Sequence, residues 1–423
     1  MVQISAVKAR EILDSRGNPT VEVDVKTKKG VSRASVPSGA STGKHEAFEL
    51  RDSGKRFLGM GVLKAVYAVN KIIAKKIINR NLTLKEIDEL MIKLDGTADK
   101  SKIGANAILA VSMACCKASA LEGGIPLYRC IAEISNNKKF LLPIPSFNII
   151  NGGKHAGNEL NFQEYMIMPV GAKSFSEALQ IGSEVYNKLK EILEKELGKM
   201  SVNIGDEGGF ASQLSCNDEP FDYIMDAVEE LGYFKKVKLA IDAAASSFYF
   251  NGQYHFEKSK IYTKALMNRY LELIKNYPLI SIEDPFYEED FYSFAEFTRR
   301  IGKNIQVVGD DLLTTNPERI KRAISLNACN CLLLKINQIG TVTETIGAYA
   351  LAKRHGWRVM VSHRSGETED SFISDLAVGL GCGQIKAGAP CRGERVSKYN
   401  QLLRIEEELG KKALFAGKVL KWW

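Results

Sequence analysis

LISIED (residues 279–284) is one of six short aliphatic runs in the second half of the chain, and each run ends at charged or polar side chains. The others are VKLAID (237–242), QVVGD (306–310), CLLLK (331–335), RVMVSHRS (358–365) and GQIK (383–386). From Glu283 to Lys386, the end residues follow one another at intervals of 23 to 28 residues. That interval is the length of a strand–helix unit, and apolar runs without alternation are typical of parallel strands buried on both faces. Such units either close into a barrel or wind into an open sheet.

Three of the runs end in acids: Asp242, Glu283 and Asp310. In a barrel, the carboxyl ends of the strands meet at one mouth, so these carboxylates are expected to converge there. Hard carboxylate oxygens without clustered cysteine or histidine favour Mg²⁺ over zinc. The alternative is that each acid pairs with a lysine or caps a helix.

The next runs supply two lysines and a polar triplet. Lys335 and Lys386 end their strands, and His363-Arg364-Ser365 follows another. A lysine near a divalent cation and a second ammonium group loses proton affinity, which suits a general base. The triplet offers an imidazole, a guanidinium and a hydroxyl, which suits a phosphate. Plain charge balance against the acids is the alternative for the lysines.

Further polar candidates lie upstream of these runs. His155 lies in the glycine-rich NIINGGKHAGN (148–158), and Glu207 lies in GDEGG (205–209). Gln163 and Glu164 interrupt the apolar run NFQEYMIMP, so Glu164 is expected to be buried and paired, as many site acids are. A structural histidine and solvated turn acids are the alternatives for His155 and Glu207.

The first part of the chain has a different pattern. TVEVDV (20–25) alternates and predicts a strand, with 31–36 as its hairpin partner. Residues 70–79 and 105–122 are predicted helices. The polar stretch 135–139, which is followed by prolines, predicts a boundary between an N-terminal α+β domain (1–138) and a C-terminal α/β domain (139–423).

Composition excludes several classes of protein. The chain has 423 residues, of which 45% are hydrophobic and 26% charged, unlike disordered or fibrous proteins. The net charge of +8 suits a small anionic substrate, and without a long basic run it does not point to nucleic acid. No apolar stretch reaches the ~18 residues of a membrane span. Charged residues within 1–17 argue against a signal peptide, and eight cysteines without a CxxC pair indicate reduced thiols in a cytoplasmic protein.

Residues 39–43 (GASTG) match the G-x-S-x-G nucleophile pattern around Ser41. A serine hydrolase needs that serine on a sharp turn between a central strand and a helix, whereas here only a predicted hairpin precedes it. The segment also misses the P-loop spacing. A small flexible loop with two hydroxyl groups suits an active-site lid instead.

Taken together, the sequence closely resembles the enolase family along residues 9–408. The matching segments include SRGNPTVEV (15–23), VPSGASTG (36–43), GANAIL (104–109), NIINGGKHAGN (148–158), GDEGGF (205–210), SIEDPF (281–286), GDDL (309–312), KINQIGT (335–341), SHRSGETED (362–370) and KYNQLLRIEEEL (398–409). The resemblance implies an antiparallel sheet with helices, followed by an eight-stranded TIM-like barrel with an atypical start. It also implies the reversible dehydration of 2-phosphoglycerate to phosphoenolpyruvate with two Mg²⁺ ions per active site.

The resemblance also implies residue roles. Asp242, Glu283 and Asp310 would bind the first metal, and Ser41 would help to bind the second. Lys335 would remove the α-proton, and Glu207 would act as the acid for the leaving hydroxyl. The implied substrate contacts are His155, Gln163, Glu164, His363, Arg364, Ser365 and Lys386.

Members of the family are homo-oligomers, either dimers or octamers, and the same state is expected here. Neither nucleic acid nor a membrane span is expected to be needed. A scaffold protein that keeps the fold without catalysis is the alternative, but such a protein should have lost a ligand or the base, and all of them are present.

Overall fold

The computed structural model describes residues 1–40 and 42–420. Its N-terminal part is a three-stranded antiparallel sheet covered by helices. The strands are β2 (Ala6–Leu13), β3 (Pro19–Lys26) and β4 (Val31–Ser35). The predicted hairpin forms, with Val25 opposite Ser32. The inward valines of β3 are buried, and helix α4 (Ala105–Gly123) packs on β3 and β4 with 14 of its 19 residues buried.

Shorter elements complete this part of the chain. The predicted helix 70–79 is the end of a longer helical stretch that begins at Leu63 and ends at Ile77, with a π-helical segment, Ala68–Ile73, in its middle. The remaining elements are β1 (Val2–Gln3), α1 (Leu63–Tyr67), α2 (Ala74–Ile77), β5 (Asn81–Leu82), α3 (Leu84–Asp95) and α5 (Leu127–Ser135). Among the described residues, no single helix is long and apolar enough to cross a bilayer, although α4 and α5 together meet that test across a bend of 103°.

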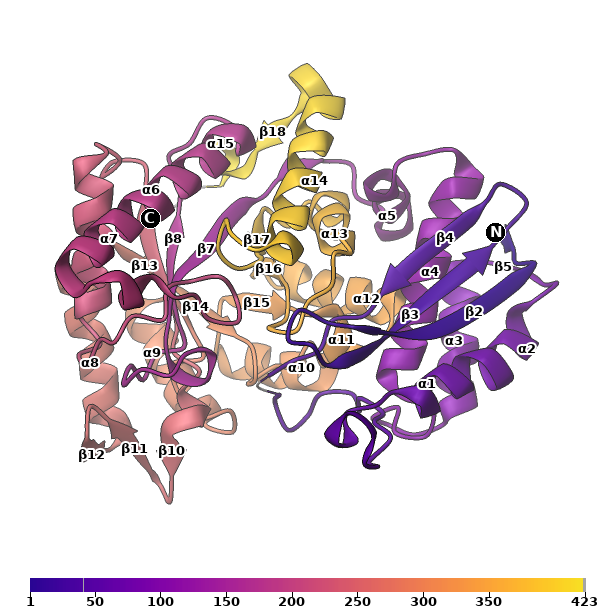
Figure 1. Cartoon of the computed structure of the whole chain (residues 1–423), viewed down its shortest axis with the longest axis horizontal. Helices are drawn as coiled ribbons and strands as arrows, with labels where there is room; N and C mark the ends of the chain where they lie inside the picture. The colour runs from indigo at the N-terminus through magenta and orange to yellow at the C-terminus, as the bar shows by residue number, and fades with distance from the viewer. Residues whose placement is uncertain (41, 421–423) are drawn as a thin grey trace.

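The rest of the chain forms a closed eight-stranded barrel, which Figure 1 places beside the N-terminal sheet. Its strands are β7 (Ile144–Asn151), β8 (Glu164–Met168), β9 (Lys238–Asp242), β13 (Leu279–Glu283), β14 (Gln306–Gly309), β15 (Cys331–Leu334), β16 (Arg358–Ser362) and β17 (Gln384–Lys386). Strand β8 runs antiparallel to both β7 and β9, whereas the other neighbouring pairs are parallel. The expected barrel with an atypical start is therefore confirmed.

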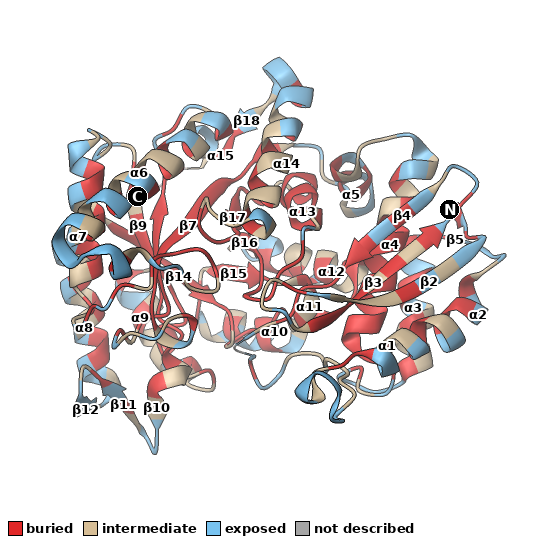
Figure 2. Cartoon of the chain, in the orientation of Figure 1, coloured by how far each residue is buried: buried red, intermediate tan, exposed pale blue. Residues whose placement is uncertain are grey.

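Helices surround the barrel, and Figure 2 shows buried strands inside a shell of half-exposed helices. The helices are α6 (Phe175–Leu197), α7 (Glu219–Glu230), α8 (Thr263–Asn276), α9 (Phe291–Ile301), α10 (Pro317–Leu326), α11 (Ile336–Ile339), α12 (Val342–Arg354), α13 (Phe372–Leu380), α14 (Gly393–Leu409) and α15 (Ala416–Val419). Small strands lie outside the barrel: β6 (Leu141–Leu142), β10 (Tyr249–Phe250), β11 (Gln253–Phe256), β12 (Ser259–Ile261) and β18 (Leu414–Phe415).

The N-terminal part contacts the loops at the carboxyl ends of the barrel strands. Ser38 forms a β-bridge with Gly366, and the Ala47 N–H donates to the Gln338 carbonyl at 2.8 Å. The segment that carries the predicted lid is therefore anchored on both sides at the mouth of the barrel. Ser41 itself lies outside the described residues.

Gly182 in α6 provides a test of the packing of helix against barrel. An added Cβ would lie within 2.8 Å of three ring atoms of the buried Phe147 on β7. We expect Gly182→Ala to lower the free energy of unfolding by about 1–3 kcal/mol. The matched control is Gly347→Ala in α12, whose Cβ would meet nothing within 4 Å and should raise stability by about 0.5–1 kcal/mol. Urea unfolding measures the free energy of unfolding of both variants. Equal changes in Gly182→Ala and Gly347→Ala would contradict the close packing of α6 on β7.

Candidate active site

Three carboxylates lie side by side because of strand register. Glu164 of β8 is the partner of Asp242 of β9, and Asp242 is the partner of Glu283 of β13. Since β8 runs in the opposite direction, its first residue lies at the mouth, where its neighbours end. Adjacent strands are ~4.8 Å apart, so the three acids form a row.

One buried ammonium group holds this row together. Lys386 Nζ lies 3.1 Å from Glu164 Oε1, 3.1 Å from Asp242 Oδ2 and 2.8 Å from Glu283 Oε1. Burial alone would lower the pKa of Lys386, but the three carboxylates raise it well above its usual range. Burial raises the pKa of Glu283, and the nearby charge of Asp242 raises it further. The alternative that the sequence offered for Lys386 was that its charge simply balances the charges of the acids. The three contacts with Glu164, Asp242 and Glu283 provide that balance.

Asp310, the residue after β14, pairs with a different lysine, Lys335, the residue after β15. Burial opposes ionisation of Asp310, but Lys335 more than offsets it and lowers the pKa of that carboxyl group. Burial likewise disfavours the charge of Lys335, yet Asp310 raises the pKa of the lysine above its usual value. The sequence predicted that a cation nearby would weaken the proton affinity of Lys335, whereas in this structure Asp310 strengthens the proton affinity of that lysine.

Several supporting side chains escaped sequence reasoning. Gln338 Nε2 donates to Asp310 Oδ1 at 2.9 Å, and Asp284 accepts the backbone N–H groups of Asp310 and Asp311 at 2.9 and 2.6 Å. Burial, together with the smaller effect of the charge of Asp310, raises the pKa of Asp311 to about 8. The paired acids in IEDP and GDDL were the signal that a second carboxylate follows each of these strand ends, and Asp284 is the one that accepts hydrogen bonds there.

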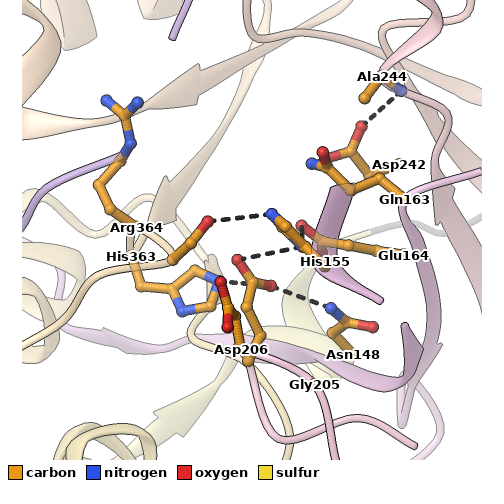
Figure 3. A network of polar contacts seen from close by, with 12 residues as sticks. Asn148, His155, Gln163, Glu164, Gly205, Asp206, Asp242, Ala244, His363 and Arg364 are labelled. Atoms are coloured by element: carbon orange, nitrogen blue, oxygen red, sulfur yellow. Dashed lines mark hydrogen bonds and ion pairs between the residues drawn. The ribbon is translucent and has the colours of Figure 1, made fainter. Parts of the chain in front are cut away.

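On another side of the mouth, nitrogen atoms surround Glu207. Figure 3 shows the side chains that carry them, Asn148, His155 and His363, close to one another. Asn148 Nδ2 donates to Glu207 Oε2 at 3.0 Å, His363 Nε2 lies 3.3 Å from the same oxygen, and His155 Nδ1 lies 3.6 Å from Oε1. Burial would raise the pKa of Glu207, but its contacts with His155 and His363, together with the charge of the Arg395 guanidinium, hold it well below its usual range. Burial lowers the pKa of His363 to about 3 and also lowers that of His155, so both rings are neutral near pH 7.

Arg364 and Ser365 occupy the loop after β16. Arg364 forms an ion pair with Glu46 at 2.7 Å and donates to Asn337 Oδ1 at 3.0 Å, while Ser365 Oγ lies 3.0 Å from His155 Nε2. Glu46, beside the predicted lid, is a further residue that sequence reasoning missed.

A single cavity brings most of the predicted residues together. It is lined by His155, Gln163, Glu164, Glu207, Asp310, Lys335, His363, Arg364, Ser365 and Lys386, among others. Asp242 and Glu283 contact Lys386, and Gln163 Nε2 donates to Asp242 Oδ2 at 3.3 Å. A predicted amine, acid and guanidinium thus face one space.

The donor set fits a divalent cation. Four buried carboxylates, those of Glu164, Asp242, Glu283 and Asp310, face only two ammonium groups, and Glu164 Oε2 is buried without a hydrogen-bond partner. In the described part of the chain, two groups place three possible ligand atoms within 4.8 Å: His155, Glu164 and Glu207, and Asp284, Asp310 and Asp311. The trio predicted from sequence is not one of them, because Lys386 contacts two of its members and Lys335 the third.

The serine-hydrolase alternative lacks its structural context. The described residues on either side of Ser41, 36–40 and 42–50, form no helix, so β4 does not lead into a strand–turn–helix elbow. The segment instead continues to the barrel contacts described above.

Two buried lysines allow a test of the excess negative charge. Lys386→Met removes the ammonium from three carboxylates and should lower the free energy of unfolding in EDTA by about 3–5 kcal/mol. Mg²⁺ should restore much of this loss, because the freed carboxylates bind it. Lys398→Met is the control, since Lys398 pairs with one acid, Glu367, at 2.9 Å and should gain little from Mg²⁺. Equal stabilisation of both variants in urea unfolding would contradict the site.

Comparison with known protein families agrees with this geometry. Residues 4–131 match the family model described as the enolase N-terminal domain, and residues 139–422 match the enolase C-terminal TIM barrel domain. Together the two matches span almost the whole chain and indicate a lyase. The chain therefore belongs to the enolase family.

Proposed function

We propose that this protein catalyses the reversible dehydration of 2-phosphoglycerate to phosphoenolpyruvate. The observation that carries the proposal is that Lys335, Glu207 and Arg364 line one cavity. The reaction needs a base for the proton beside the carboxylate, an acid for the leaving hydroxyl, and positive charge for the phosphate. The cavity contains one group of each kind.

Asp242, Glu283 and Asp310 would hold the first Mg²⁺, and Ser41 would contribute to a second. The excess of carboxylates over ammonium groups supports this assignment. When bound, the ions would stabilise the dianion that forms when a proton leaves the carbon beside a carboxylate.

Lys335 is the proposed base, and its surroundings explain how it could lose a proton. Burial, Arg364 and Lys386 lower the pKa of Lys335, whereas Asp310 and, to a lesser extent, Glu283 raise it. Once the charge of Asp310 is engaged in ligation, the lowering influences remain and the amine becomes a base. Nζ would then take the α-proton.

Glu207 is the proposed acid for the hydroxyl, and it must carry a proton in the dehydration direction. Its low pKa keeps it ionised in the free site, which suits the hydration direction, where it takes a proton from water. A phosphate and a carboxylate in the same cavity would raise its pKa by like-charge repulsion. Substrate binding therefore favours the protonated acid.

The remaining residues would bind and orient the substrate. Arg364 and Ser365 would hold the phosphate, with Arg364 exchanging part of its contact with Glu46 for phosphate oxygens. Lys386, Gln163, Glu164, His155 and His363 would surround the rest of the molecule.

The wider assignments follow from the same proposal. We infer domains at 1–138 and 139–423, a homodimer or octamer, and cytoplasmic action without a nucleic acid or membrane partner. Exposed apolar side chains such as Leu13, Phe57 and Leu58 support a subunit contact. The eight cysteines are free, which suits a reducing compartment.

The first test is an assay of phosphoenolpyruvate formation by its absorbance, with and without EDTA. We expect turnover of 2-phosphoglycerate that is lost on chelation and restored by Mg²⁺. Absence of turnover at any Mg²⁺ concentration would favour the scaffold alternative. Activity that survives exhaustive chelation would rule out the proposed metal chemistry.

The second test separates the base from the acid. Lys335→Ala should abolish exchange of the substrate α-proton with deuterated water, and turnover should fall on the order of 10²–10⁴-fold, because the other amine of the cavity, Lys386, is paired with three carboxylates. Glu207→Gln should lose turnover to a similar extent but retain more of the exchange, because the amide cannot donate a proton to the hydroxyl. Equal loss of both quantities in Glu207→Gln would contradict the divided roles.

A further inference from the structure

Arg395, in the first turn of α14, is among the largest side chains that are completely buried. Its guanidinium contacts the loop after β16 and the loop that carries Glu207. Nη1 lies 2.7 Å from His363 Nδ1 and donates to the Arg364 carbonyl at 2.6 Å. Nη2 donates to the carbonyls of Asp206, at 2.9 Å, and Ser365.

The contact with His363 determines where that ring carries its proton. A guanidinium is always protonated and cannot accept a hydrogen bond, so a nitrogen 2.7 Å from it must offer a lone pair. Nδ1 is therefore the unprotonated nitrogen of a neutral ring, and the proton resides on Nε2. Nε2 is the atom that lies 3.3 Å from Glu207 Oε2.

We propose that Arg395 is a positioning residue that fixes the Nε2–H tautomer of His363 and so keeps the protonated ring nitrogen, rather than a lone pair, beside Glu207, 3.3 Å from Oε2. Neither residue needs to contact the substrate for this effect. The low pKa of His363, caused first by burial and opposed by Glu207, agrees with a neutral ring. For its catalytic consequence this inference rests on the proposed function, whereas the tautomer itself does not.

Loss of Arg395 should reverse the arrangement. The carbonyls of Arg364 and Ser365 would lose a donor, and a proton on Nδ1 could satisfy one of them. Glu207 would then face a lone pair or a charged ring. A protonated Glu207 would then donate its proton to the Nε2 lone pair instead of the leaving hydroxyl, and so dehydration would slow while α-proton removal by Lys335 continued.

Nearby Arg392 provides a matched control. It contacts the Glu207 loop, where Nη1 donates to the Gly205 carbonyl at 3.4 Å, and the segment at Ser15, where Nη2 donates to the backbone carbonyl at 3.1 Å. Arg395 also approaches Ser15, with Nη2 at 3.5 Å from its Oγ. Its contacts within the described residues do not include the imidazole. Removing Arg392 therefore loosens the Glu207 loop and the Ser15 segment without changing the partner of Nδ1.

The test is ¹⁵N NMR of the full-length, histidine-labelled protein in EDTA, in which His363→Asn assigns one of only five histidines. In the wild type we expect Nδ1 of His363 to resonate as an unprotonated nitrogen and Nε2 as a protonated one. The wild-type spectrum alone can overturn the proposal, because a protonated Nδ1 is incompatible with the guanidinium contact.

The variants separate the contact from general loop stability. Arg395→Met should move Nδ1 to the protonated position, whereas Arg392→Gln should leave it unchanged. Arg395→Lys, which keeps a donor-only cation, should retain the wild-type tautomer in most molecules and serves if Arg395→Met does not fold. An unchanged Nδ1 in Arg395→Met, or the same change in Arg392→Gln, would overturn the proposal.

A kinetic measurement tests the catalytic consequence. Turnover of 2-phosphoglycerate by Arg395→Met should fall on the order of 10²-fold, with KM and α-proton exchange much less affected, and Arg395→Lys should recover part of it. Exchange that falls as far as turnover would contradict the assigned consequence. If the wild type has no such turnover, the proposed function fails while the NMR result still decides the tautomer.

Discussion

The ammonium group of Lys386, buried against three carboxylates, is the interaction on which the barrel mouth depends. Strand register makes Glu164, Asp242 and Glu283 neighbours, and buried like charges cannot remain ionised side by side without compensation. A cation must therefore stand among them, whether it is an ammonium group or a metal ion. The remaining features of the site follow from how that positive charge is distributed.

Backbone strain contributes to the same arrangement next to the proposed base. Thr314 and Thr315 both have positive φ angles, 46° and 52°, which are unfavourable for β-branched residues. Thr315 Oγ1 accepts the backbone N–H of Lys335 at 3.1 Å and donates to Gln338 Oε1 at 2.8 Å. Gln338 in turn donates to Asp310, so a strained turn orients the carboxylate that controls the lysine.

Sequence could predict the parts of the fold that repeat. Strands β9 and β13 to β17 are short apolar runs at a regular spacing, and their charged ends reach one mouth because parallel strands share a direction. Strands β7 and β8 carry no such repeat, since they form an antiparallel pair and polar residues such as Asn148 interrupt the first of them. Only the resemblance to a known family indicated that the barrel begins differently.

The site residues that escaped prediction share a physical reason. Arg395 begins a helix rich in charged residues, where an arginine normally lies in solvent, and only the fold reveals that it is completely buried. Glu46 and Gln338 contact site residues that are remote in sequence. Pairings of this kind depend on how the two parts of the chain meet, which local patterns do not encode.

Anomalous diffraction from crystals soaked with Mn²⁺, a substitute for Mg²⁺, tests the central claim most directly. The account predicts a peak within coordination distance of Asp242, Glu283 and Asp310, with the ammonium groups of Lys386 and Lys335 withdrawn from those oxygens. A peak that lies away from these three carboxylates, or an ion-free mouth in which Lys386 keeps all its contacts at saturating Mn²⁺, would contradict it.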